Sequence, residues 1–116
     1  MIDVSQADDM NELLCASDVL VTDYSSSAFD AICAYIPVFL YADDLEEYEK
    51  ERGKLMWDMR ALPFSMAENN EELVENIGRF DERRYRKEID EFQIRYGVIE
   101  DGHACERVAE IIENAY

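Results

Sequence analysis

The stretch from residue 18 to residue 30, Asp18-Val-Leu-Val-Thr-Asp-Tyr-Ser-Ser-Ser-Ala-Phe-Asp30, decides the fold class of this chain. Its residues 19–21 form a short, unbroken apolar run, which is typical of a strand covered on both faces in a parallel sheet. After a polar turn, residues 28–35 are almost wholly apolar, with Asp30 as their only charge, and they are long enough for two helical turns. The stretch therefore predicts a strand, a tight turn and the start of a helix.

The turn between that strand and that helix is a candidate anion site. A helix start presents unpaired backbone N–H groups and the positive end of the helix dipole, so it can hold a phosphate without a lysine. Ser25, Ser26 and Ser27 add small hydroxyl donors at this point. The alternative is helix capping, because serine is a preferred N-cap residue. Capping needs one serine rather than three, and the residues alone leave both interpretations open.

A second short apolar strand is expected at residues 38–41, after a helix that runs from Ser27 to Tyr35 and is closed by Pro37. Strand, helix and strand then form a right-handed crossover unit of a parallel sheet. Ligands of open parallel sheets bind beyond the carboxyl ends of the strands. We therefore predict an α/β fold, a Rossmann-like parallel sheet with flanking helices, in which the loops at residues 23–27 and 42–48 border one cleft.

Capping residues and apolar periodicity predict the remaining elements. Helices are expected from Asp9 to near Ser17, from Asn69 through Phe80, from Glu82 to Tyr96 and from Ala104 to about Asn114. The apolar faces of the last three helices are expected to consist of Leu73, Val74, Ile77 and Phe80, of Tyr85, Ile89, Phe92 and Tyr96, and of Val108, Ile111 and Ile112. Residues 2–4 are expected to be the tail of a strand, residues 44–50 a short acidic helix, and residues 62–64 an extended return segment.

Length and charge limit the class of protein. A chain of 116 residues with 48% hydrophobic content is large enough for one domain with a modest core. Its formal net charge of −17, from 11 basic and 28 acidic residues, argues against binding to nucleic acid or to anionic lipid surfaces. No apolar run reaches the roughly 18 residues that span a bilayer, and the first residues lack the pattern of a signal peptide. Cys15, Cys33 and Cys105 are far apart, which favours reduced cytosolic thiols.

The opening stretch resembles the donor-binding turn of the CDP-glycerol glycerophosphotransferases, which prime or polymerise the poly(glycerol phosphate) chains of bacterial teichoic acids. Further segments carry the resemblance over almost the whole chain: Pro37-Val-Phe-Leu-Tyr41, Asp44-Leu-Glu-Glu-Tyr48, Glu51-Arg-Gly53, Leu62-Pro-Phe64 and Asp101-Gly-His-Ala-Cys-Glu-Arg-Val108. His103 and Cys105 depart from the pattern, because relatives more often carry lysine-like and serine-like residues there. The role of that last turn therefore stays open.

The resemblance implies a two-domain GT-B enzyme whose two Rossmann-like halves face a cleft, with residues 1–116 as the C-terminal portion of the donor-binding half. Such an enzyme moves glycerol phosphate from CDP-glycerol to a lipid-linked teichoic acid or similar polymer and releases CMP. The histidine motifs that supply the catalytic base are absent from this sequence, so this chain alone is expected to be inactive, with the acceptor bound through the missing domain. The resemblance also implies no metal, no cofactor and a cytoplasmic, peripheral location at the inner face of the membrane.

The same resemblance gives roles to residues of the turn. Ser25 and Ser26 would hold the pyrophosphate of CDP-glycerol and stabilise the charge that grows on the CMP leaving group. Asp30 lies four residues after Ser26, on the same side of the helix, and looks like a ribose-binding carboxylate, although an acid here also favours the helix dipole. Asp23 either faces the cleft or bonds a turn amide, and we favour the structural role.

Other polar residues are weaker candidates. Arg52 can clamp a phosphate with two hydrogen bonds, but it also fits a solvated charge in a mixed run. His103 fits a surface or capping residue better than a general base. The acids of residues 43–47 fit a solvated helix start better than a metal site. Two other functions remain open, another GT-B nucleotide-sugar glycosyltransferase and a non-catalytic interaction module, and a homo-oligomer is not excluded.

Overall fold

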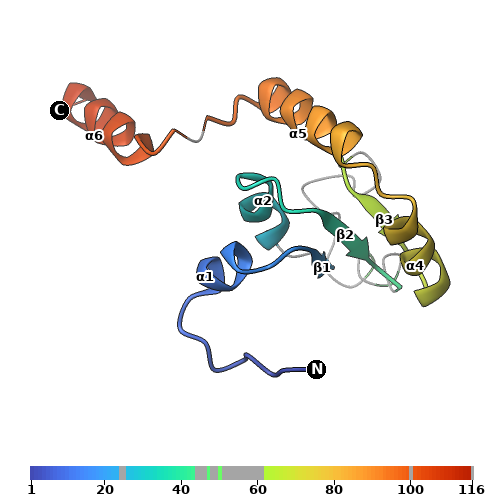
Figure 1. Ribbon diagram of the computed structural model, residues 1–116. Coiled ribbons are helices and arrows are strands. Elements are labelled where there is room, and N and C mark those ends of the chain that lie inside the picture. Colours follow the sequence, from blue (N-terminus) through green and yellow to red (C-terminus); the bar gives the residue numbers. More distant parts are fainter. Residues whose placement is uncertain (24–25, 44–46, 48–49, 51–61, 100, 116) are drawn as a thin grey trace.

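The computed structural model describes residues 1–23, 26–43, 62–99 and 101–115, together with Glu47 and Lys50. Within these residues three parallel strands lie in the order β1-β2-β3, with helices around them (Figure 1). The elements are α1 (Met10–Cys15), β1 (Leu20–Thr22), α2 (Ser27–Ile32), β2 (Val38–Tyr41), β3 (Ser65–Ala67), α4 (Asn70–Gly78), α5 (Glu82–Tyr96) and α6 (Ala104–Ala115). The predicted α/β fold with a parallel sheet and flanking helices is confirmed.

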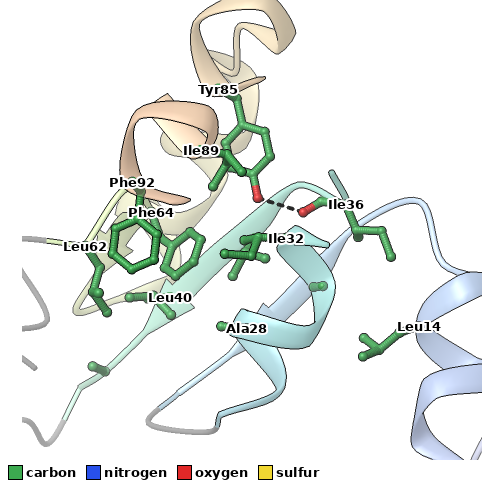
Figure 2. Close-up of a cluster of buried hydrophobic side chains, with 13 residues drawn as sticks. Leu14, Ala28, Ile32, Ile36, Leu40, Leu62, Phe64, Tyr85, Ile89 and Phe92 are labelled. Atoms are coloured by element: carbon green, nitrogen blue, oxygen red, sulfur yellow. Dashed lines mark hydrogen bonds between the residues drawn. The ribbon is translucent and has the colours of Figure 1, made fainter. Parts of the chain in front are cut away.

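The sheet separates two layers of helices. Leu40 of β2 belongs to the buried cluster that also contains Ile32 of α2 and Ile89 of α5 (Figure 2). The neighbouring Phe39 points to the other face, because side chains alternate along a strand. There its ring lies 5.7 Å from the ring of Phe80, at the end of α4. Helices α2 and α5 therefore cover one face of the sheet, and α4 covers part of the other.

Strand β1 differs from the prediction that both of its faces are covered. Val19 and Val21 remain 44% and 46% exposed. Strand β1 is at the edge of the described sheet, and Val21 is paired with Phe39 in the register. Helix α4 packs on β2 and β3, so it covers Phe39 but leaves the same face of β1 open.

The N-terminal segment also differs from its prediction. Residues 2–4 form no strand, and Ile2 and Val4 are exposed. The carboxylate of Asp3 instead accepts hydrogen bonds from the backbone N–H and the hydroxyl of Ser5, which closes a local turn. Helix α1 is capped by Asp9 as predicted, because the Asp9 carboxylate accepts from the backbone N–H of Asn11 at 2.8 Å.

Helix α2 ends earlier than expected. It stops at Ile32, although the sequence predicts a helix as far as Tyr35. Tyr35 adopts a left-handed backbone conformation with φ 54°, and the N–H of Ile36 donates to the carbonyl oxygen of Ala31 at 3.1 Å. This is the hydrogen-bond pattern of a helix terminus. The chain therefore turns towards β2 before Pro37 acts on it.

The predicted cap of α4 is observed, and α5 begins with a capping residue, Asp81, that was not predicted. The side chain of Asn69 accepts from the N–H of Glu72 at 2.9 Å and begins α4. Asp81 accepts from two backbone N–H groups at the start of α5, and Gly97, with φ 67°, ends that helix as predicted. Residues 62–64 form bends rather than an extended segment, and the strand begins immediately after them, at Ser65.

The predicted apolar faces of α4, α5 and α6 differ in how far they are buried. Tyr85, Ile89 and Phe92 of α5 are buried, while Tyr96 is 47% exposed. Helices α4 and α6 contain no buried residue. Among the described residues, α6 lies apart from the sheet and exposes its apolar stripe, which consists of Val108, Ile111 and Ile112 (Figure 1).

Candidate functional site

The candidate site lies where strands β1 and β2 end, which we call the carboxyl edge. The two strands are parallel, and Thr22 is the register partner of Leu40. Asp23 therefore leaves β1 beside the segment that leaves β2, and both Asp23 and Asp43 are exposed. The N–H of Ala42 donates to the carbonyl oxygen of Ala67 at 2.9 Å, which fixes the first residue after β2 against β3. This is the edge at which ligands of open parallel sheets bind.

Ser26 is the N-cap residue of α2 and is exposed. Its backbone is already helical, with φ −65° and ψ −11°, and its side chain makes no capping hydrogen bond. Capping therefore does not account for the Ser26 hydroxyl. The adjacent Ser27 is buried, with 8% of its surface exposed, so it is less accessible to a ligand.

The short length of α2 changes the electrostatic argument. The helix has six residues rather than the nine expected from Ser27 to Tyr35, so few aligned peptide dipoles lie behind its first turn. An anion held here would depend mainly on nearby N–H and hydroxyl groups, because those groups lie closest to it.

Asp30 lies in the first turn of α2 and is exposed. Its neighbours Ala28, Ala31 and Ile32 form the buried side of this helix. Because residues four apart lie on one side of a helix, Asp30 follows Ser26 along the solvent-exposed side. The helix therefore presents a hydroxyl and a carboxylate one turn apart, suited to ligand groups that accept and donate hydrogen bonds.

Two predicted site residues, Ser25 and Arg52, lie outside the described residues. The predicted acidic helix at residues 44–50 also falls mainly outside them. The roles of Ser25 and Arg52 stay predictions. Asp23, Ser26 and Asp30 are the predicted site residues that the structure describes.

His103 belongs to a different part of the molecule, the segment that leads into α6 (Figure 1). The Asp101 carboxylate accepts from the N–H of His103 at 3.0 Å, and Arg107 donates to both Asp101 oxygens at 2.7 and 2.9 Å. The hydrogen bonds from Arg107 hold the pKa of Asp101 below its ordinary value. The imidazole of His103 lies 3.2 Å from Glu106. These contacts support the structural interpretation of His103.

Helix α5 is tied to the end of α2 by contacts that the sequence did not indicate. The buried hydroxyl of Tyr85 donates to the carbonyl oxygen of Ile36 at 2.7 Å, and burial raises the pKa of Tyr85 (Figure 2). The Tyr35 hydroxyl donates to Asp90, a hydrogen bond that raises the pKa of Tyr35. The partners of these two bonds are 49 and 55 residues apart, so no local periodicity signals them.

The part of the chain that the structure describes has exposed cysteines but no cluster of metal ligands. No group of three or more His, Cys, Asp or Glu side chains there is arranged to hold a metal ion. Cys15, Cys33 and Cys105 are exposed, and the thiol of Cys33 lies 3.5 Å from the carbonyl oxygen of Phe29. None of the described helices combines the length and the apolar character needed to cross a membrane.

A parallel sheet with helices on both faces is an α/β, Rossmann-like arrangement, and its polar turn lies at the carboxyl edge of the sheet. The chain belongs to the family described as CDP-Glycerol:Poly(glycerophosphate) glycerophosphotransferase, whose model matches residues 1–114. The family expected from the sequence is thereby confirmed.

Curated relatives agree with the family. The chain is 36% identical over 113 residues to a teichoic acid glycerol-phosphate transferase of Staphylococcus aureus, with 95% of this chain and 29% of the relative covered. It is 34% identical over 114 residues to a teichoic acid poly(glycerol phosphate) polymerase of Staphylococcus epidermidis, with coverages of 96% and 16%. It is 32% identical over 114 residues to a teichoic acid ribitol-phosphate primase of Bacillus spizizenii, with coverages of 98% and 29%. The chain thus spans less than a third of each of these relatives, and no solved structure matches it.

Proposed function

We propose that this chain is the C-terminal portion of the donor-binding domain of a GT-B-type enzyme. The enzyme transfers glycerol phosphate from CDP-glycerol to a lipid-linked teichoic acid or similar cell-surface polymer and releases CMP. The observation that carries the proposal is the family match over residues 1–114, which includes the polar turn at the carboxyl edge. Residues 1–116 would then form one portion of a larger domain.

In the proposed mechanism the turn holds the leaving group. Backbone N–H groups and the hydroxyls of Ser25 and Ser26 donate to the pyrophosphate, and they stabilise the negative charge that develops on CMP as the phosphoryl bond breaks. The Asp30 carboxylate accepts from the ribose hydroxyls. Local donors are required because the chain carries a formal net charge of −17, which repels a diphosphate at longer range. Arg52 would clamp a phosphate with two hydrogen bonds, and Asp23 would shape the turn.

The chemistry that this chain does not supply belongs to the remainder of the enzyme. We assign no catalytic base to these 116 residues, and we expect the isolated chain to be inactive. The polymer acceptor would bind across the cleft from the carboxyl edge. The proposed enzyme needs no metal or organic cofactor, and it works from the cytoplasmic side, at the inner face of the membrane.

A ribitol phosphate donor is the second candidate, and a specific observation favours it. A teichoic acid ribitol-phosphate primase is 32% identical to this chain, and the match covers 98% of this chain. The proposed contacts of Ser26 and Asp30 are to the pyrophosphate and the ribose, which both CDP-linked donors share. These proposed contacts therefore do not select between the two polyols.

The proposal is tested by product analysis with the full-length enzyme. Purified protein is incubated with a lipid-linked acceptor and, separately, CDP-glycerol, CDP-ribitol or a UDP-sugar. We expect CMP to be released and the acceptor to grow by glycerol phosphate units. An enzyme that releases UDP from a UDP-sugar but no CMP is a sugar transferase, which contradicts the proposal. A protein that turns over none of the donors is better explained as a non-catalytic interaction module.

A further inference from the structure

Helix α5 contacts both the first half of α2 and the turn that follows α2. In that turn, Tyr85 donates to the carbonyl oxygen of Ile36, and Tyr35 donates to Asp90. At the N-terminal end the contact is aromatic. The ring of Phe29 stacks on that of Phe92, with centroids 6.2 Å apart and an angle of 22° between the planes. The same ring meets Phe64 edge to face at 6.3 Å.

The N-terminal contact is the one next to the proposed donor site. Phe29 lies three residues after Ser26 and immediately before Asp30. A six-residue helix is not stable by itself, and the Ser26 side chain makes no capping hydrogen bond to fix its first turn. The position of this turn therefore depends on packing, to which the Phe29–Phe92 stack contributes directly.

From these contacts we propose that Phe92 is a positioning residue for the donor site. By holding Phe29, its ring sets the place of Ser26 and Asp30 relative to the carboxyl edge, although Phe92 itself touches no substrate. This inference rests on the proposed function, since it assigns a task to Phe92 only if α2 holds the nucleotide. The inference adds Phe92 to the residues on which the donor site depends, although Phe92 lies about 60 positions after the polar turn in the sequence.

The proposed binding of one donor by two residues requires that α2 be held in place. Ser26 and Asp30 have to reach the pyrophosphate and the ribose of one donor at the same time. A displacement of about 1 Å at groups that position a substrate can lower activity by up to about a hundredfold. Loss of the Phe92 ring should therefore weaken donor binding more than it weakens the fold.

Variants of the full-length enzyme test the proposal. Phe92→Leu removes the ring, and Phe92→Tyr keeps it. Phe92 lines a groove of about 490 Å³ with Leu62 and Pro63, and for this reason tyrosine is chosen as the variant that keeps the ring. Ile89→Val is the matched control, because it removes one methyl from a side chain with 0% exposure on the same helix and leaves the stack in place. Asp30→Asn reports on the proposed donor site itself.

We expect Phe92→Leu to raise KM for CDP-glycerol on the order of tenfold and to lower kcat as well, because the displaced Ser26 also stabilises the leaving group in the proposed mechanism. Phe92→Tyr and Ile89→Val should keep the wild-type KM, although Phe92→Leu and Ile89→Val both lower the melting temperature by a few degrees. Should Phe92→Leu not fold, Phe92→Met, which fills similar space without a ring, takes its place.

The outcomes distinguish a failure of the positioning role of Phe92 from a failure of the proposed function. If the wild type is active and Phe92→Leu has the same KM as Ile89→Val, Phe92 has no positioning role. The same conclusion follows if Phe92→Tyr is as impaired as Phe92→Leu. If Asp30→Asn leaves KM unchanged in an active enzyme, α2 does not hold the donor and the assignment of Phe92 is wrong. A wild type that uses no CDP-linked donor refutes the proposed function, and the inference fails with it.

Discussion

The two faces of the sheet differ in how completely they are covered. On the face of α2 and α5, Ala31, Ile32 and Ile89 have at most 1% of their surface exposed, and Tyr85 adds a buried hydrogen bond. On the face of α4, Phe39 and Ala67 are buried, but Val21 of β1 is 46% exposed and Val74 of α4 is 70% exposed. The candidate donor site thus belongs to the more tightly packed face. Since a turn that positions a substrate needs rigid support, this difference predicts where substitutions should matter most.

The largest change in the free energy of unfolding is expected for a substitution in the buried cluster. Ile89→Ala should lower the free energy of unfolding by about 3 kcal/mol, because it removes apolar contacts and leaves a cavity in the packed face. Val74→Ala on the open face should change it by less than about 0.5 kcal/mol. Chemical denaturation of the full-length protein measures both. Equal losses at the two positions would show that the faces are equally packed in solution.

A smaller effect is expected from the hydrogen bond between α5 and the turn after α2. Tyr85→Phe leaves the carbonyl oxygen of Ile36 without its partner in a buried position, which should cost about 1 to 3 kcal/mol. Tyr35→Phe removes the bond to Asp90, which is more exposed, and should cost less. The same denaturation experiment compares them. A cost for Tyr85→Phe no larger than that for Tyr35→Phe would argue against the buried bond.

The helix caps provide a third comparison of the two faces. Asp81→Ala and Asn69→Ala each remove a capping side chain, which typically costs about 1 kcal/mol. Because α5 contributes buried residues and α4 contributes none, loss of the α5 cap should lower global stability, whereas loss of the α4 cap should mainly fray α4. Amide hydrogen exchange distinguishes the two results. Uniform loss of protection in Asn69→Ala would mean that α4 unfolds only with the whole domain.

The smallest effect concerns the start of α6, which lies outside both packed faces. The hydrogen bonds from Arg107 lower the pKa of Asp101 in the folded chain. Their stabilising contribution is therefore fully present above the ordinary aspartate pKa and is lost as the pH falls below about 4 and through the lowered value. Amide chemical shifts of Arg107 should follow this titration in the wild type and not in Asp101→Asn. A wild-type titration at the ordinary pKa would show that the Asp101–Arg107 pair does not persist in solution.

Local sequence signals predicted most elements of the fold. Helix α5 has its predicted bounds, because its apolar residues recur at helical spacing and Gly97 marks its C-terminal end. The sequence predicts that α2 ends at Tyr35, later than observed, because a tyrosine gives no signal of the left-handed backbone conformation that Tyr35 adopts. The cover over β1 was misjudged, because an apolar run predicts burial without showing which helix provides it.

The residues of the candidate site also fall into those that the sequence predicts and those that it does not. The spacing of Ser26 and Asp30 is local, so the sequence indicated that they share one side of a helix. The support from Phe92 and Tyr85 arises from packing between segments far apart in the chain, which periodicity does not reveal. This explains why the sequence indicated residues proposed to touch the donor and missed those proposed to hold them in place.

The most direct test of the central claim is the affinity of the full-length protein for CDP-glycerol, measured by calorimetry for the wild type and for Asp30→Asn. The substitution removes a negative charge from a strongly acidic chain, so electrostatics alone would tighten binding of the anionic donor. We predict the opposite, a loss of affinity on the order of tenfold from the lost ribose contact, with wild-type affinity in the Asp101→Asn control. Equal or tighter binding to Asp30→Asn would contradict the claim that α2 holds the nucleotide.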